Sequence, residues 1–133
     1  MGQQQLLLIV LGVIVVGIAV VVGINLFNAN AVSANRDGVV SDLNNLGAMA
    51  QQFYKKPLAM GGGGNTFNTG GVSGSGWTLP AELDTTANGN YTIVVAAQTV
   101  TITGNGTESN DAGTKIQHTA TVTPKLITVA QVR

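Results

Sequence analysis

The chain has no cysteine among its 133 residues, which excludes disulfide bonds and cysteine-bound metals but does not fix the compartment. Charge is also scarce, since only 9% of the residues are charged and six basic side chains balance six acidic ones. A basic patch for nucleic acid is therefore not expected. Histidine occurs once, as His118, and we expect it to be a strand residue on the surface rather than a ligand or base.

Residues suited to catalysis form no recognisable pattern. Ser73 in GVSGSG lacks the strand-turn-helix setting of a nucleophile elbow, and the glycine-rich stretch around it lacks the GK[ST] of a phosphate-binding loop. The carboxylates suggest neither a calcium loop nor an acid/base pair; they are Asp37, Asp42, Glu82, Asp84, Glu108 and Asp111. We predict no enzyme, no metal site and no cofactor.

The chain does have one long apolar run near its N-terminus. Leu6 to Ile24 reads LLLIVLGVIVVGIAVVVGI, nineteen residues without a polar side chain. About twenty such residues span a bilayer as a helix. No basic region precedes the run and no cleavage pattern follows it, so we expect it to be retained rather than removed as a signal peptide.

Two interpretations of this run stay open, an ordinary membrane anchor and a helix that packs against other copies. No Lys, Arg, Trp or Tyr flanks the run to mark a membrane interface, which weighs against a simple anchor. Gly12, Gly17 and Gly23 leave gaps where neighbouring helices can approach closely.

The helix is predicted to continue into water, because the first proline is Pro57. Larger apolar residues recur at helical spacing along one face, at Val32, Val39, Leu43, Leu46, Ala50 and Phe53. Pro57 and the glycines at 61–64 end the helix.

The rest of the chain predicts a loop and a small sheet. The glycine-rich stretch is typical of a surface loop, after which Trp77, Leu79 and Leu83 return the chain to the core. Runs rich in Val, Ile and Thr predict four antiparallel strands, over 91–97, 99–103, 115–123 and 126–132. Turns are predicted at Ala97–Gln98, Asn105–Gly106 and 111–113.

The predicted fold is α+β, with one long N-terminal helix packed on a small antiparallel sheet. We divide it into an apolar membrane or filament-core helix over 1–27, its amphipathic continuation over 28–56, a loop over 57–76 and a β-rich head over 77–133.

On these features the chain resembles a bacterial type IV pilin in its mature form. The resemblance covers the architecture of the whole chain, while the sequence likeness is limited to about the first 56 residues, including ANRDGVVSDLNNLGAMAQQFYKKP. It implies cleavage by a prepilin peptidase, with Met1 as the mature and often N-methylated first residue. It also implies that the apolar helices bundle at the centre of a filament while the heads face outward.

The chain departs from this family at two points. The family usually has a glutamate at the fifth position, thought to pair with a neighbour's N-terminal amine, and Gln5 stands here. Either the amine loses its proton on burial, or the amides of Gln3, Gln4 and Gln5 form a polar layer around it; otherwise the glutamines only mark where the helix leaves lipid. The family's usual proline in the apolar helix is also missing, and Gly17 and Gly23 are the candidates for local unwinding.

The leading hypothesis is a major pilin: a structural subunit of an extracellular filament, held in the inner membrane before assembly. Its partners would be other copies of itself and the pilus assembly machinery. The alternatives are a minor pilin or pseudopilin of a secretion or DNA-uptake system, and a membrane-anchored surface binding module. Asn90 and Asn105 each begin an N-glycosylation sequon and are candidate modification sites.

Overall fold

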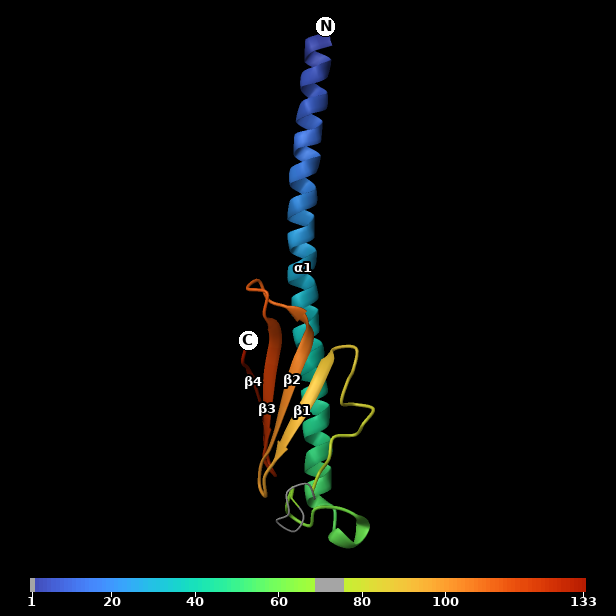
Figure 1. Cartoon of the computed structure of the whole chain (residues 1–133), viewed down its shortest axis with the longest axis vertical. Coiled ribbons are helices and arrows are strands. Elements are labelled where there is room, and N and C mark those ends of the chain that lie inside the picture. The colour runs from blue at the N-terminus through green and yellow to red at the C-terminus, as the bar shows by residue number, and fades with distance from the viewer. Residues whose placement is uncertain (1, 69–75) are drawn as a thin grey trace.

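The computed structural model describes residues 2–68 and 76–133 and is dominated by one helix (Figure 1). Helix α1 (Gly2–Lys55) is continuous over 54 residues, about 80 Å at 1.5 Å per residue. It ends before Pro57, as the sequence predicts, and a short 3-10 turn η1 (Leu58–Met60) follows. The apolar segment and its amphipathic continuation therefore belong to one unbroken rod.

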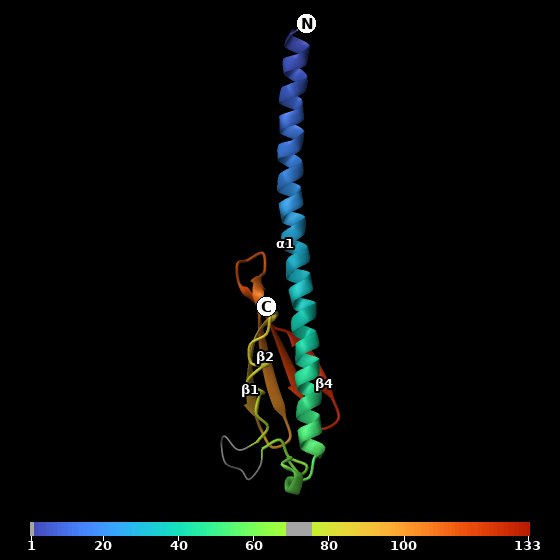
Figure 2. The same cartoon turned by 90° about the vertical axis from the view of Figure 1, so that its right-hand side faces the viewer.

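A four-stranded antiparallel sheet lies along the second half of α1 (Figures 1 and 2). The strands are β1 (Gly89–Val95), β2 (Val100–Ser109), β3 (Lys115–Val122) and β4 (Ile127–Gln131), and they neighbour one another in chain order. The first half of α1 extends beyond the head (Figure 2), and its large apolar side chains are exposed. The α+β fold predicted from the sequence is confirmed.

The core lies between the helix and the sheet, because the apolar stripe of α1 faces the inward side chains of the strands. Val39, Leu43 and Ala50 are fully buried against it. The sheet contributes alternate residues, which are Tyr91, Val100, Ile102, Ala120 and Val122. Trp77 is 6% exposed, and Leu79 and Leu83 pack against the same cluster, so the predicted return of the chain to the core is confirmed.

The predicted turn at Asn105–Gly106 is wrong, because both residues lie inside β2. Gly104 and Gly106 do not form a turn; they allow β2 to approach its neighbours closely. A Cβ on Gly104 would stand 2.9 Å from Val39 Cγ1, and one on Gly106 would overlap Asn35 Oδ1 and Ile116 Cγ1. The glycines let β2 lie directly against α1, and this strand continues to Ser109 with a bulge after Asn105.

The other turns agree better with the sequence. Residues 96–99 join β1 to β2, with the Ala96 N–H donating to the Thr99 carbonyl at 2.8 Å. Residues 110–114 join β2 to β3, and Gly113 adopts a positive φ of 74° there. The expectation about Ser73 and part of the predicted 57–76 loop lie outside the described residues.

Candidate functional site

The most prominent candidate site is the bare half of α1. From Leu6 to Phe27 every large hydrophobic side chain is more than half exposed, from 53% at Ile14 to 78% at Phe27. Within the described residues, α1 is the one helix long and apolar enough to cross a membrane. A helix that is apolar on all sides is not stable in water, so lipid or other protein must cover this segment.

Polar residues lie near the two ends of this segment, with Gln3, Gln4 and Gln5 just before it and Asn25 close to its other end. Gln3, Gln4 and Gln5 lie in the first turn of α1 and are exposed. Successive helical residues point about 100° apart, so three consecutive amides form a collar around the helix rather than a stripe along it. The predicted role of Met1 lies outside the described residues, and the polar layer stays a prediction.

The three glycines of the apolar run do not serve packing within the chain, since a Cβ at Gly12, Gly17 or Gly23 would meet nothing within 4 Å. Gly12 and Gly23 are eleven residues apart and so fall within about 20° of each other around the axis, whereas Gly17 lies about 140° from Gly12. The helix is continuous through Gly17 and Gly23, so the single chain shows no unwinding there. Unwinding in an assembly stays a prediction.

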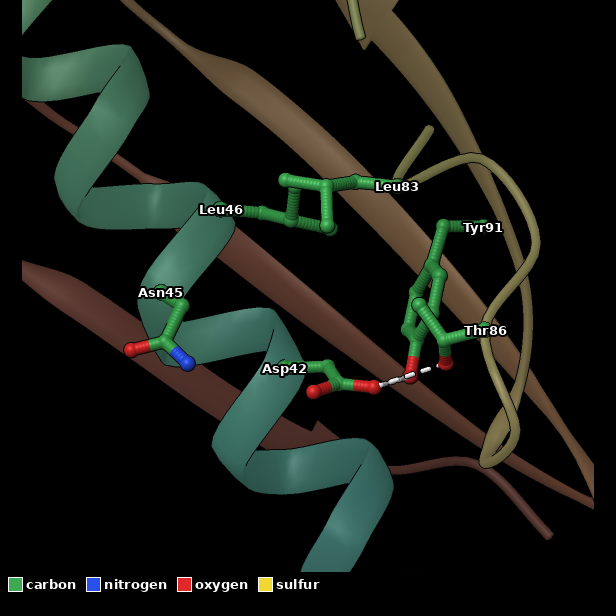
Figure 3. Close-up of a pocket in the computed structure, with 6 residues that line it drawn as sticks. All are labelled: Asp42, Asn45, Leu46, Leu83, Thr86 and Tyr91. Carbon is green, nitrogen blue, oxygen red and sulfur yellow. Dashed lines mark hydrogen bonds between the residues drawn. The ribbon is translucent and has the colours of Figure 1, made fainter. Parts of the chain in front are cut away.

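A second candidate is the polar contact between α1 and the segment leading into β1 (Figure 3). Asp42 Oδ2 accepts hydrogen bonds from the Tyr91 hydroxyl at 2.6 Å, from the Thr86 hydroxyl at 2.9 Å and from Asn88 Nδ2 at 3.0 Å. We call these four residues the Asp42 clamp. Three of them, Asp42, Thr86 and Tyr91, border a pocket of about 140 Å³ whose other lining residues are Asn45, Leu46 and Leu83.

The clamp is an ionised carboxylate held by neutral donors. Burial alone would raise the pKa of Asp42, but the hydrogen bonds from Tyr91, Asn88 and Thr86 outweigh it and leave that pKa below its usual 3.8. Burial and the bond to Asp42 raise the pKa of the Tyr91 hydroxyl. Tyr91 and Thr86 already donate their hydroxyl hydrogens to the carboxylate. The arrangement therefore suits a structural role, in which these hydrogen bonds hold the segment leading into β1 against the helix.

Asn35, about two turns before Asp42 on α1, also joins the helix to the head by hydrogen bonds. Its Nδ2 donates to the Asn88 carbonyl at 2.8 Å and to the Thr107 hydroxyl at 3.2 Å, and its Oδ1 accepts from the Glu108 N–H at 3.3 Å. Asn35 was not predicted from the sequence, because an amide on a helix carries no periodicity signal. Its place, four residues before Val39 on the apolar stripe, was the one available clue.

The expectation that His118 is a surface residue is wrong. His118 faces α1 from β3 and is only 5% exposed, and its Nδ1 has no hydrogen-bond partner. Burial lowers the pKa of His118, and the positive charge of Arg36 lowers it further. Arg36 Nε is also buried without a partner. The alternation of β3 explains the position, because residue 118 falls between the inward-facing Ile116 and Ala120.

The two candidate glycosylation residues face away from the helix. Asn90 on β1 is exposed, and it stands directly opposite Asn105 on β2. Asn105 is half-buried, and its Oδ1 accepts a hydrogen bond from Gln117 Nε2 at 2.8 Å. Asn90 is therefore the more accessible of the two, and glycosylation of either stays a prediction.

Comparison with known proteins adds no relative. No family model matches the chain, and neither curated proteins nor solved structures give a significant match. The function of the chain must therefore be inferred from its own sequence and geometry.

Proposed function

We propose that this chain is a structural subunit of an extracellular helical filament of the type IV pilus kind, assembled through the apolar half of α1. The observation that carries the proposal is the bare apolar segment from Leu6 to Phe27 on a helix that continues without a break into the head. At 1.5 Å per residue this segment is about 33 Å long, enough to cross the apolar layer of a bilayer before assembly.

The continuity of α1 favours a filament subunit over an anchored binding module. The helix that contains the apolar segment continues into the head, where its residues Val39, Leu43 and Leu46 form part of the core. Such a rod fixes where the head lies relative to the buried segment, which a helical lattice of identical subunits requires. A module that only needed attachment would work as well on a flexible linker.

Lipid already satisfies apolar side chains, so the gain on assembly must come from close packing and polar contacts. The gaps at Gly12 and Gly23 lie on one side of α1 and the gap at Gly17 on another, so the helix can receive neighbours from two directions. The collar of glutamine amides at residues 3–5 supplies polar partners at the tip, where polar groups of neighbouring copies need hydrogen bonds once they are buried.

The test separates packing between helices from insertion into lipid. The full chain is purified in detergent, the detergent is removed, and filaments are counted by electron microscopy. Gly12→Leu/Gly23→Leu keeps the segment apolar but fills both gaps, so membrane insertion should persist while filament number falls at least tenfold. Val15→Leu, which fills no gap, is the matched control and should assemble like the native chain.

Two results would contradict the proposal. A native chain that stays in the membrane of its own cells as a monomer, and forms no filament there or after detergent removal, would favour the anchored module. Equal filament numbers from the native chain and the double leucine variant would show that the glycine gaps are not contact points.

A further inference from the structure

A second pocket lies where the head meets the bare half of α1. It has a volume of about 210 Å³ and is lined by Ala29, Val32, Ser33, Arg36, Asn110 and Asp111. The first four share one face of α1, and the last two belong to the turn that joins β2 to β3. This turn is the part of the head nearest the apolar segment (Figures 1 and 2).

The spacing along α1 places this pocket in the headgroup layer of a bilayer. When residues 6–27 fill the hydrocarbon layer, Ala29 lies about 3 Å beyond it and Ser33 about 9 Å beyond it, at 1.5 Å per residue. The headgroup layer extends about 5–8 Å beyond the hydrocarbon on each side. Arg36 lies farther out, but helical side chains lean toward the N-terminus of their helix, so its guanidinium reaches back toward that layer.

Arg36 is a cation without a partner. No charged side chain precedes it in the sequence, so it is the charge closest to the apolar segment. Within residues 2–68 and 76–133 its guanidinium forms no hydrogen bond or ion pair, and its Nε is buried. A guanidinium keeps its charge in proteins and binds phosphate oxygens through paired N–H donors. An anionic group in the pocket would supply the missing partner.

The other side of the pocket carries the opposite charge, on the exposed Asp111. A headgroup with both a phosphate and an ammonium matches this pair, since the phosphate can meet Arg36 and the Ser33 hydroxyl while the ammonium meets Asp111. A headgroup with a net negative charge would be repelled by Asp111. The exposed charges near the pocket that do not line it have a net negative sum, which adds to this repulsion; they are Asp37, Glu108 and Lys115.

We propose that this pocket binds the headgroup of a zwitterionic phospholipid that bears a primary ammonium, in the leaflet on the side of the head. This rests on the membrane stage of the proposed function, before the subunit joins a filament. Pockets for drug-sized ligands begin at about 300 Å³, so this smaller one suits a headgroup whose acyl chains stay in the bilayer. The contact sets the depth of α1 in the membrane, because no Lys, Trp or Tyr beside the apolar segment does so.

Native mass spectrometry of the full chain in a mild detergent tests this by counting the lipids bound from equal concentrations of phosphatidylethanolamine and phosphatidylglycerol. The native chain should bind the first about fivefold more, the effect of one exposed ion pair. Arg36→Gln should lower phosphatidylethanolamine binding about tenfold, because it removes a charge-assisted contact to phosphate. Its matched control, Lys125→Gln, removes the same charge at an exposed position beyond the other end of β3 and should bind like the native chain.

Asp111→Asn should abolish the preference between the two lipids, while Asp84→Asn, the same change at an exposed position outside the pocket, should retain it. Asp111→Lys guards against misfolding, because it should reverse the preference toward phosphatidylglycerol rather than merely lose binding. Soluble phosphoethanolamine should bind far more weakly than the lipid, since no acyl chains hold it beside the helix.

Equal binding of the two lipids by the native chain would overturn the inference, and so would an Asp111→Lys variant that keeps the native preference. Soluble phosphoethanolamine that binds as well as the lipid would overturn the assignment to a phospholipid. Filaments built from a chain without lipid preference would leave the proposed function intact. A lipid-selective chain that never assembles would instead contradict the proposed function and support the inference.

Discussion

Replacing Asp42 by asparagine should destabilise the head by about 2 kcal/mol, because it keeps the shape of the side chain and removes its charge. Hydrogen bonds to a charged group contribute about 1.5–3 kcal/mol and neutral ones about 0.5–1.5. Three donors meet Asp42 Oδ2, and the strongest comes from Tyr91, which is only 1% exposed. Partial exposure of the carboxylate reduces the sum, which leaves about 2 kcal/mol in all.

Urea unfolding of the full chain in detergent measures this loss, followed by the fluorescence of Trp77, the one tryptophan, which is 6% exposed. Asp37→Asn makes the same change at an exposed position on the same helix and should stay within about 0.5 kcal/mol of the native chain.

Tyr91→Phe and the double variant complete a cycle, in which the two changes should couple by about 1–2 kcal/mol. Since the folded pKa of Asp42 lies below 3.8, its contribution is present at neutral pH and is lost as pH falls through that lowered value. If Asp42→Asn cost no more than Asp37→Asn, the clamp would not be a stabilising contact.

Two further predictions concern the head. Gly106→Ala should destabilise it by about 1–3 kcal/mol, because the added Cβ overlaps Asn35 and Ile116, whereas Gly23→Ala should leave the Trp77 transition unchanged since no atom lies near its Cβ. His118 has a folded pKa below 6.5, so the unfolded chain binds the proton first and the urea midpoint should fall as pH drops below about 6.5. His118→Gln should remove that slope, and an unchanged slope would assign it to another group.

The helix and the sheet could be predicted because their signals are local. The helix is indicated by the absence of proline before Pro57 and by apolar residues at helical spacing. The strands are indicated by short runs rich in Val, Ile and Thr, and each of these signals involves only a few neighbouring residues. The error at Asn105–Gly106 has a physical cause, since glycine permits both a turn and a close approach of two elements, and only the tertiary structure decides between them.

The contacts within the head could not be predicted in the same way. Asp42 meets Tyr91 across 49 residues and Asn35 meets Thr107 across 72, and no local pattern links such partners. His118 is buried because alternate residues of β3 face the helix, and its neighbours Ile116 and Ala120 indicate that residue 118 belongs to the inward set. The sequence analysis instead followed the general tendency of histidine to lie at the surface. The roles predicted from sequence for Gln3–Gln5 and for the glycine gaps stay predictions, because only neighbouring copies of the chain could test them.

The most direct test of the central claim is electron microscopy of filaments sheared from native cells, combined with mass spectrometry of the same fraction. We expect thin filaments composed of this chain, with residues 6–27 of neighbouring copies packed in the core and the sheets outside. If the chain instead remains in the membrane fraction and no filament contains it, the apolar half of α1 is an anchor and the filament proposal is wrong.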